Sequence, residues 1–411
     1  MLALALASRV MAADSAVASL PQHLGVASCA ASICHGKIKP QANADVALNE
    51  YRIWLLSDRH SQAFRILQSP KSRAIANKLG FDDATRVRQC LDCHADNVPV
   101  EQRGDKFVLS DGVGCEVCHG AAQSWIASHS KAGTAHADNV AHGLVPLDRA
   151  AVRADVCLSC HAGNGERFVT HTLIAAGHPR LRFELETFLA NMPVHYKGSI
   201  GGVNLWLLGQ LQNARNQLQL LRADWLAGSG LQPELAFFEC YACHRPVDEP
   251  RWTQQRAGAG VLPGALRLQH QSLAVLQIIA GLIEPQSLPE LQQAIADYRQ
   301  TGSQNLTAVA RVATRLTAWL DARSAWTTRR YDNADAQQLR LLLIAFAASD
   351  QGSDYTVAEQ LVLSLESLSH TLGDVAARRV ALDALYATVR TPAAFDPAAF
   401  ARVARSVRGQ F

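Results

Sequence analysis

Apolar side chains recur at steps of three and four residues through the last part of the chain. Four stretches there are rich in Leu and Ala and contain no proline: 266–283, 338–347, 358–372 and 375–389. A fifth series has the spacing of one face of an α-helix: Leu306, Val309, Ala313, Leu316 and Leu320. Glycines stand near the expected helix ends, at Gly281, Gly302, Gly352 and Gly373. This pattern predicts a helical bundle or helical repeat over residues 251–411.

The part of the chain before residue 251 has a different pattern. One segment, 51–67, has a single apolar helical face that includes a histidine: Ile53, Leu56, His60, Phe64 and Leu67. The remainder is rich in Gly, His, Asp and Asn between short helical pieces. No stretch keeps the period-two alternation of a strand for long. We therefore predict a mainly α fold.

All ten cysteines occur in pairs, and a histidine directly follows each pair. Four motifs read Cys-x-x-Cys-His: Cys90, Cys93 and His94; Cys115, Cys118 and His119; Cys157, Cys160 and His161; Cys240, Cys243 and His244. The first motif is longer, with four residues between its cysteines: Cys29, Cys34 and His35. Cys-x-x-Cys-His is the attachment sequence of a c-type haem, in which the thiols bind the haem covalently and the histidine binds the iron. The sequence thus predicts five covalently attached c-type haems. Porphyrins supply apolar area, so this region needs fewer large side chains.

Other uses of paired cysteines explain less of this pattern. A disulfide framework also uses an even number of cysteines, but it gives no reason for the histidines. Structural zinc requires a second Cys/His pair at a short spacing, and a thioredoxin-like site would be single. The first motif departs most from the attachment sequence, because two residues must loop out between Cys29 and Cys34.

The second axial ligands are expected to be histidines. The chain has 15 histidines and three methionines, and two of the methionines, Met1 and Met11, lie in the expected leader. Only Met192 could serve an iron, so coordination should be mainly bis-His, which favours electron transfer over ligand chemistry. The distal candidates are His60, His129, His136, His171 and His178. The reserve histidines are His23, His142, His195, His270 and His370.

Four of the distal candidates form two pairs with the same spacing. His129 and His136 stand seven residues apart, as do His171 and His178. On a helix this spacing corresponds to two turns, so the members of a pair would serve different haems. Pro179 disfavours helix at His178 and places it at a helix end.

Haem attachment of this type implies export to the periplasm. Residues 1–20, with a short apolar run and small residues around Met11, are interpreted as a signal peptide; a true start further upstream would explain the short run. Residues 21–250 are then the pentahaem domain and 251–411 a haem-free helical domain. No later stretch reaches the ~18 apolar residues of a transmembrane span. The formal charge of +3 would fall to roughly −2 with five haems. No basic stripe indicates nucleic acid.

Three segments resemble the multihaem cytochrome c superfamily that includes the tetrahaem partner of hydroxylamine oxidoreductase. They are Cys90-Leu-Asp-Cys93-His94-Ala-Asp-Asn, Gly112-Val-Gly-Cys115-Glu-Val-Cys118-His119-Gly120 and Ala176-Gly177-His178-Pro179-Arg180-Leu181. The segment around His60 also resembles that family's distal-histidine helix. The resemblance covers roughly residues 25–245, and it implies a mostly helical fold with few strands and closely packed haems. Five motifs in place of four, the stretched first motif and the long tail depart from the family.

The leading hypothesis is a periplasmic electron carrier with an unidentified quinol-linked or soluble donor and acceptor. The alternative is a multihaem oxidoreductase with one open-coordinate haem that acts on a small nitrogen or sulfur compound; Arg180, Arg182 or Tyr196 could line such a site. No Cys-x-x-Cys-Lys motif is present, and the histidines suffice to close every iron, so the carrier is favoured. A third hypothesis is a subunit of a larger respiratory complex that docks through the C-terminal helical domain.

Overall fold

The computed structural model describes residues 20–41, 46–195, 201–221, 233–244, 266–301 and 306–411. In this part of the chain β structure is limited to two isolated bridges, His23 with Arg103 and Phe238 with Leu268. The prediction of a mainly α fold with few strands is confirmed. The predicted signal peptide except residue 20, the predicted boundary at 250/251, and Tyr196 and Gly302 lie outside the described residues.

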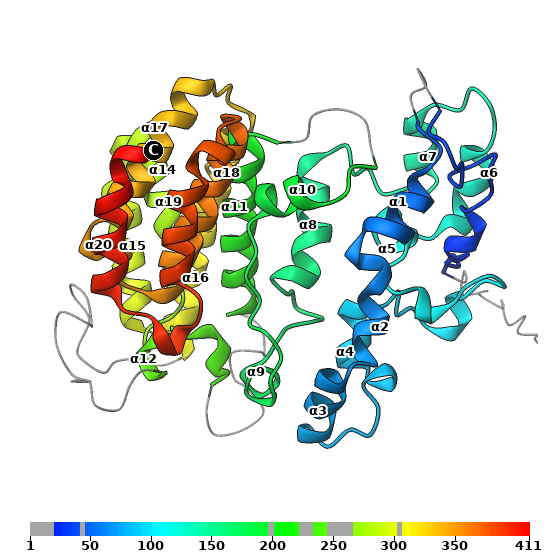
Figure 1. The fold of residues 1–411 in the computed structure, drawn as a ribbon, viewed down its shortest axis with the longest axis horizontal. Helices are drawn as coiled ribbons and strands as arrows, with labels where there is room; N and C mark the ends of the chain where they lie inside the picture. The colour runs from blue at the N-terminus through cyan, green and yellow to red at the C-terminus, as the bar shows by residue number, and fades with distance from the viewer. Residues whose placement is uncertain (1–19, 42–45, 196–200, 222–232, 245–265, 302–305) are drawn as a thin grey trace, which may run out of the picture.

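The first part consists of short helices separated by turns and loops, in the middle and on the right in Figure 1. Its apolar clusters are small: one includes Leu67 and Leu91, and the other includes Leu158 and Phe183. The helices are α1 (Glu50–Ser57), α2 (Ala63–Leu67), α3 (Pro70–Lys78), α4 (Arg88–His94), α5 (Cys115–His119), α6 (Ile126–His129), α7 (His136–Ala141), α8 (Ala150–His161), α9 (His171–Ala176) and α10 (Leu185–Asn191).

The prediction of a single helix over 51–67 is wrong, because the helix is interrupted at Asp58. Helix α1 ends at Ser57, Asp58 is extended, and the side chain of Asp58 accepts a hydrogen bond from the backbone N–H of His60. An aspartate that bonds its own neighbouring backbone favours a turn over a continuing helix. His60 therefore lies on a 3₁₀ turn between α1 and α2.

The second part is a bundle of longer helices, on the left in Figure 1. Its helices are α11 (Val203–Leu220), α12 (Cys240–Cys243), α14 (Gln271–Ile283), α15 (Leu288–Thr301), α16 (Leu306–Asp321), α17 (Asn333–Ala347), α18 (Tyr355–Thr371), α19 (Val375–Thr388) and α20 (Pro397–Val407). The helices expected from the apolar periodicity are confirmed, whereas α11, α15 and α20 were not predicted. No described helix is long and apolar enough to cross a membrane.

The largest apolar core runs through the whole bundle. It also includes residues that precede the predicted helical domain at 251–411. It contains Val203 and Trp206 of α11 and Tyr241 of α12, together with buried residues of α14–α20 as far as Phe411. Helix α18 is buried over most of its length. Tyr241, within the last cysteine motif, is thus packed into the same core as the helices that follow it, whereas Cys243 and His244 are exposed.

Candidate haem sites

Four of the five cysteine motifs lie on or at the end of short helices. These are α4, α5, α8 and α12, where a helix places two residues three apart on the same side. The stretched motif follows a 3₁₀ turn, and its extra residues form a loop closed by hydrogen bonds from Cys34 N to Ala31 O (2.9 Å) and from His35 N to Cys29 O (3.1 Å). The loop returns His35 to Cys29, as a shared haem would require.

Four of the five motif histidines face a second histidine from a distant segment. The distances between ring centres are 5.9 Å for His35 and His129, 6.1 Å for His60 and His161, 6.4 Å for His94 and His178, and 6.1 Å for His171 and His244. A metal–imidazole bond is about 2 Å long. Since the ring centre lies about 1 Å beyond the bonded nitrogen, two imidazoles on opposite sides of one metal have centres roughly 6 Å apart. The four pairs have this separation.

Several of these rings are oriented by hydrogen bonds at Nδ1. Nδ1 of His35 donates to Glu50 Oε2 (2.8 Å) and that of His94 to Ala63 O (3.0 Å). Among their partners, His60 donates to Asp58 Oδ1 (2.9 Å) and His178 to Pro179 O (2.7 Å). A donor at Nδ1 leaves Nε2 free to bind a metal, which is the usual arrangement of ligating histidines.

The protonation preferences of the rings also suit iron binding. Burial, together with the charge of the nearby His60, lowers the pKa of His161 to about 4. Burial likewise lowers the pKa of His94, His129 and His178. The pKa of His60 is raised, chiefly by its hydrogen bond to Asp58, as expected of a carboxylate that increases ring basicity. A ligating imidazole must be unprotonated at Nε2.

The remaining motif histidine, His119, lies near a reserve histidine. The pKa of His119 is lowered to about 4, mainly by burial, and the next largest cause is the charge of His195. His195 comes from the segment after α10, with its Nδ1 3.2 Å from Pro193 O. Nothing in the local sequence distinguishes His195 from the other reserves, since its place beside His119 depends on the tertiary fold.

His136 is placed differently from the other four distal candidates. Its side chain is 55% exposed and its Nε2 lies 3.3 Å from Asp148 Oδ1. Within the described residues it makes no ring contact with a motif histidine. The structure therefore brings His60, His129, His171 and His178 to motif histidines, and does not bring His136.

Cysteines of different motifs also lie together. The thiols of Cys29 and Cys115 lie close enough to shift each other's pKa, as do those of Cys93 and Cys160. Arg167 joins the second pair, because its Nη1 donates to Cys160 Sγ (3.2 Å) and to the carbonyl of Asp92 (2.6 Å). The first motif is thus adjacent to the third, and the second to the fourth.

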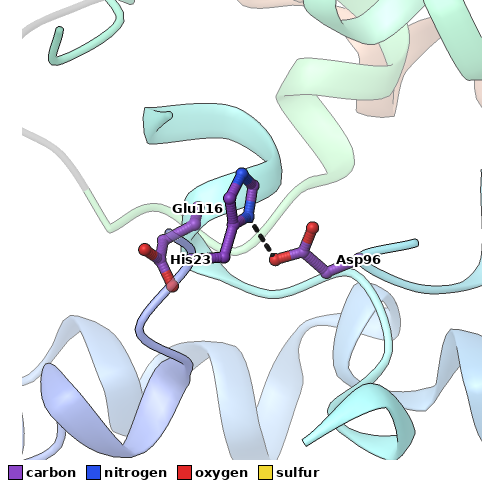
Figure 2. A group of neighbouring side chains, drawn as sticks. All are labelled: His23, Asp96 and Glu116. Carbon is purple, nitrogen blue, oxygen red and sulfur yellow. Dashed lines mark hydrogen bonds and ion pairs between the residues drawn. The ribbon is translucent and has the colours of Figure 1, made fainter. Parts of the chain in front are cut away.

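One further group of potential metal ligands lies beside the third motif. Figure 2 shows His23, Asp96 and Glu116, whose ligand atoms lie within 4.8 Å of one another. Protein partners already use this group: His23 Nδ1 donates to Asp96 (2.7 Å), and the Glu116 carboxylate accepts three backbone N–H groups, from Leu24, Gly25 and Ala122. We refer to His23, Asp96 and Glu116 as the clasp, because their hydrogen bonds hold residues 23–25 against the third motif.

The residues present fit covalently bound haem better than a purely polypeptide interior. The first part has small apolar clusters, while Ile33 and Ile38 next to the first motif are 85% and 80% exposed. Large exposed aliphatic side chains beside the motif are consistent with a bulky apolar group at this position. Paired imidazoles at the separation of axial ligands point to the same group.

Comparison with known families agrees with this reading over the first three motifs. Residues 28–120 match the family described as cytochrome c554 and c-prime. The match includes the stretched motif as well as the motifs at Cys90 and Cys115. No curated protein and no solved structure matches the chain. Residues 28–120 therefore match a cytochrome c554/c-prime family domain, which is a multihaem cytochrome c domain.

Proposed function

We propose that this protein is a periplasmic electron carrier with five covalently attached c-type haems, each held by two histidines. The observation that carries the proposal is the set of four histidine pairs with ring centres 5.9–6.4 Å apart. An iron with two histidine ligands has no open position for a substrate, so such a centre is suited to electron transfer.

For the fifth centre we infer that His195 is the partner of His119. Its support is the electrostatic effect of His195 on the buried His119, whereas His136 is exposed and bonded to Asp148. The proximal ligands proposed are His35, His94, His119, His161 and His244. Their respective distal ligands are His129, His178, His195, His60 and His171.

When bound, the haems supply reversible one-electron chemistry. The chain orients the imidazoles through the Nδ1 partners Glu50, Ala63 and Asp58. The adjacent cysteines support close approach of the first and third haems and of the second and fourth. Arg167 ties the latter two motifs together. This arrangement would keep neighbouring haems close together, so that an electron crosses a short distance from one haem to the next.

The periplasmic location is proposed from the covalent haem type, which is generally found outside the cytoplasm, and from the family of residues 28–120. A carrier needs redox partners, and we propose a quinol-linked or soluble donor and a separate acceptor. The proximity of the first and third motifs supports electron exchange between their haems.

The experiment is electron paramagnetic resonance of the oxidised holoprotein, together with a pyridine haemochrome count. We expect five covalent haems and only low-spin signals. A large high-spin signal with rapid binding of CO or nitrite would instead support the oxidoreductase with one open haem. A count of four that is unchanged in a Cys29→Ala variant would remove the first motif from the proposal.

A further inference from the structure

Helix α18 carries a row of polar side chains that form hydrogen bonds with residues between 180 and 239. The row has helical spacing along one face, and Figure 1 shows α18 beside α10 and α11. Its bonds are Thr356 to Glu239 (2.7 Å), Glu359 to Arg180, Gln360 to Gln210 (3.2 Å) and Ser367 to Glu186 (2.8 Å). A merely covering helix would not need buried polar bonds of this kind, because burying a polar group is unfavourable unless it is paired.

The first of these bonds reaches the fifth cysteine motif directly. Glu239 precedes Cys240, is 2% exposed, and accepts hydrogen bonds from Thr356 Oγ1 (2.7 Å) and Thr356 N (3.4 Å). Bonds from a hydroxyl and an N–H to a buried carboxylate are among the stronger hydrogen bonds of a protein. The first turn of α18 thus holds Oε2 of Glu239 and helps to position the start of α12.

The backbone around Glu239 forms hydrogen bonds with the segment that precedes α14. Glu239 N donates to Arg267 O (2.7 Å), and Gln269 N donates to Phe237 O (2.9 Å), on either side of the bridge between Phe238 and Leu268. The segment before the fifth motif is therefore paired with the segment that leads into α14.

Aromatic packing holds the motif itself. Tyr241 lies between the two cysteines and is 2% exposed. Its ring meets that of Phe395 edge-on, with centres 5.4 Å apart, and Phe395 has the same separation from Tyr355 at the start of α18. Edge-to-face pairs add directional preference to the apolar burial, so the motif is fixed from two sides.

The same end of α18 lies close to the haem-binding groups. Thr356 and Glu359 line a cavity together with His161 and Arg180. Burial raises the pKa of the Cys240 thiol to about 11, and the charges of Glu239, Arg180 and Glu359 also affect it. Charge, hydrogen bonding and burial near a haem are the means by which a protein adjusts its reduction potential.

We propose that α18 is a positioning element for the fifth haem: Thr356 holds Glu239 beside Cys240, so the helical region after residue 266 sets the reduction potential of the haem bound to Cys240, Cys243 and His244. This inference rests on the proposed function, because it requires a haem at that motif. It assigns the C-terminal helices a role inside the redox centre, in place of a stabilising cap or a docking surface.

The test compares Thr356→Val, which removes the hydroxyl but keeps the shape, with Thr356→Ser, which restores it. A matched control is Ser367→Ala, which removes another α18 hydroxyl bonded to a buried carboxylate. The measurement is a spectroelectrochemical titration of the full holoprotein. The wave of the fifth haem is identified as the one lost in a Cys240→Ala/Cys243→Ala variant. If that variant does not fold, His171→Met identifies it, since methionine ligation raises a haem potential.

We expect Thr356→Val to keep five haems and to shift the fifth-haem wave alone. Thr356→Ser should return the wave to the wild-type position, and Ser367→Ala should leave it there. An unchanged fifth wave in Thr356→Val, with five haems present, would overturn the inference and leave the proposed function intact. If replacing Cys240 and Cys243 leaves the number of covalent haems unchanged, both this inference and the proposed function are overturned.

Discussion

The imidazole rings of His35 and His129 lie with their centres 5.9 Å apart and their planes 12° apart, although His35 is in a turn near the N-terminus and His129 ends α6. In the proposed carrier both rings bind one iron. His129→Ala should therefore open one coordination position, and about one haem in five should become high-spin and bind CO when reduced. Electron paramagnetic resonance and CO difference spectra measure this. His136→Ala is the matched control and should remain low-spin; the opposite outcome would make His136 the ligand.

The electrostatic effect of His195 on His119 gives a second prediction. His195→Ala should convert the haem of the third motif to high-spin while the haem count stays at five, because the buried His119 would lose its partner. The same spectra in a His142→Ala variant, which replaces an exposed histidine bonded to Asp138 O, should match the wild type. An entirely low-spin His195→Ala protein would exclude His195 as a ligand.

The clasp of Figure 2 predicts a loss of stability when its carboxylate is changed. In Glu116→Gln, an amide N–H₂ group would face backbone N–H groups that now donate to a buried carboxylate. We expect a destabilisation of about 2 kcal/mol, since hydrogen bonds to charged groups contribute about 1.5–3 kcal/mol each. Thermal unfolding and faster amide exchange at Leu24 and Gly25 are the measurements. Glu101→Gln, at an exposed position, should change neither.

The ion pair between Arg340 and Asp374 predicts a dependence of stability on pH in the helical bundle. The two side chains are 2.6 Å apart, and Arg340 is 2% exposed. Burial alone would raise the pKa of Asp374, but Arg340 and Arg378 outweigh it and hold that pKa below its usual value. The stabilisation is therefore present above the unfolded-state pKa of about 3.9 and is lost as the pH falls through the lower folded-state pKa.

Asp374→Asn should consequently be less stable than the wild type at pH 7, and the difference should shrink as the pH is lowered below about 4. Unfolding midpoints measured from pH 7 down to pH 3 test this. Asp383→Asn, at a 61% exposed position in a surface pair with Arg379, is the control and should have little effect at any pH. A difference for Asp374→Asn that stays constant with pH would contradict the assignment.

Local sequence signals account for much of the fold and for part of the haem sites. Periodic apolar positions predicted α16 and α18 because those helices bury one or more complete faces. They did not predict α11, whose apolar positions are interrupted by polar residues such as Gln210, which the structure buries at 1% exposure beside Gln360. The break at Asp58 was missed for a similar reason, since an apolar face over 51–67 is compatible with one helix or with two.

The cysteine motifs could be read directly because all their chemistry lies within a few consecutive residues. The second histidines could not, because each comes from a segment far from its motif. The seven-residue spacing made His136 as plausible as His129, but only His129 reaches a motif histidine among the described residues. His195 had no such spacing, and its place next to His119 is a property of the folded chain.

The histidine pairs also bear on how this chain reaches its native state. Each pair joins positions about 70 to 100 residues apart, so an iron bound by both members closes a long loop. In the chain-entropy model, a covalent cross-link that closes a loop of this length stabilises the folded state by about 4 kcal/mol, because it lowers the entropy of the unfolded chain. The loop closed by His60 and His161 overlaps in sequence with the loop from His35 to His129 and with the loop from His94 to His178. Haem loading would then act as a series of overlapping cross-links that reduce the number of conformations open to the exported polypeptide before its helices finish packing.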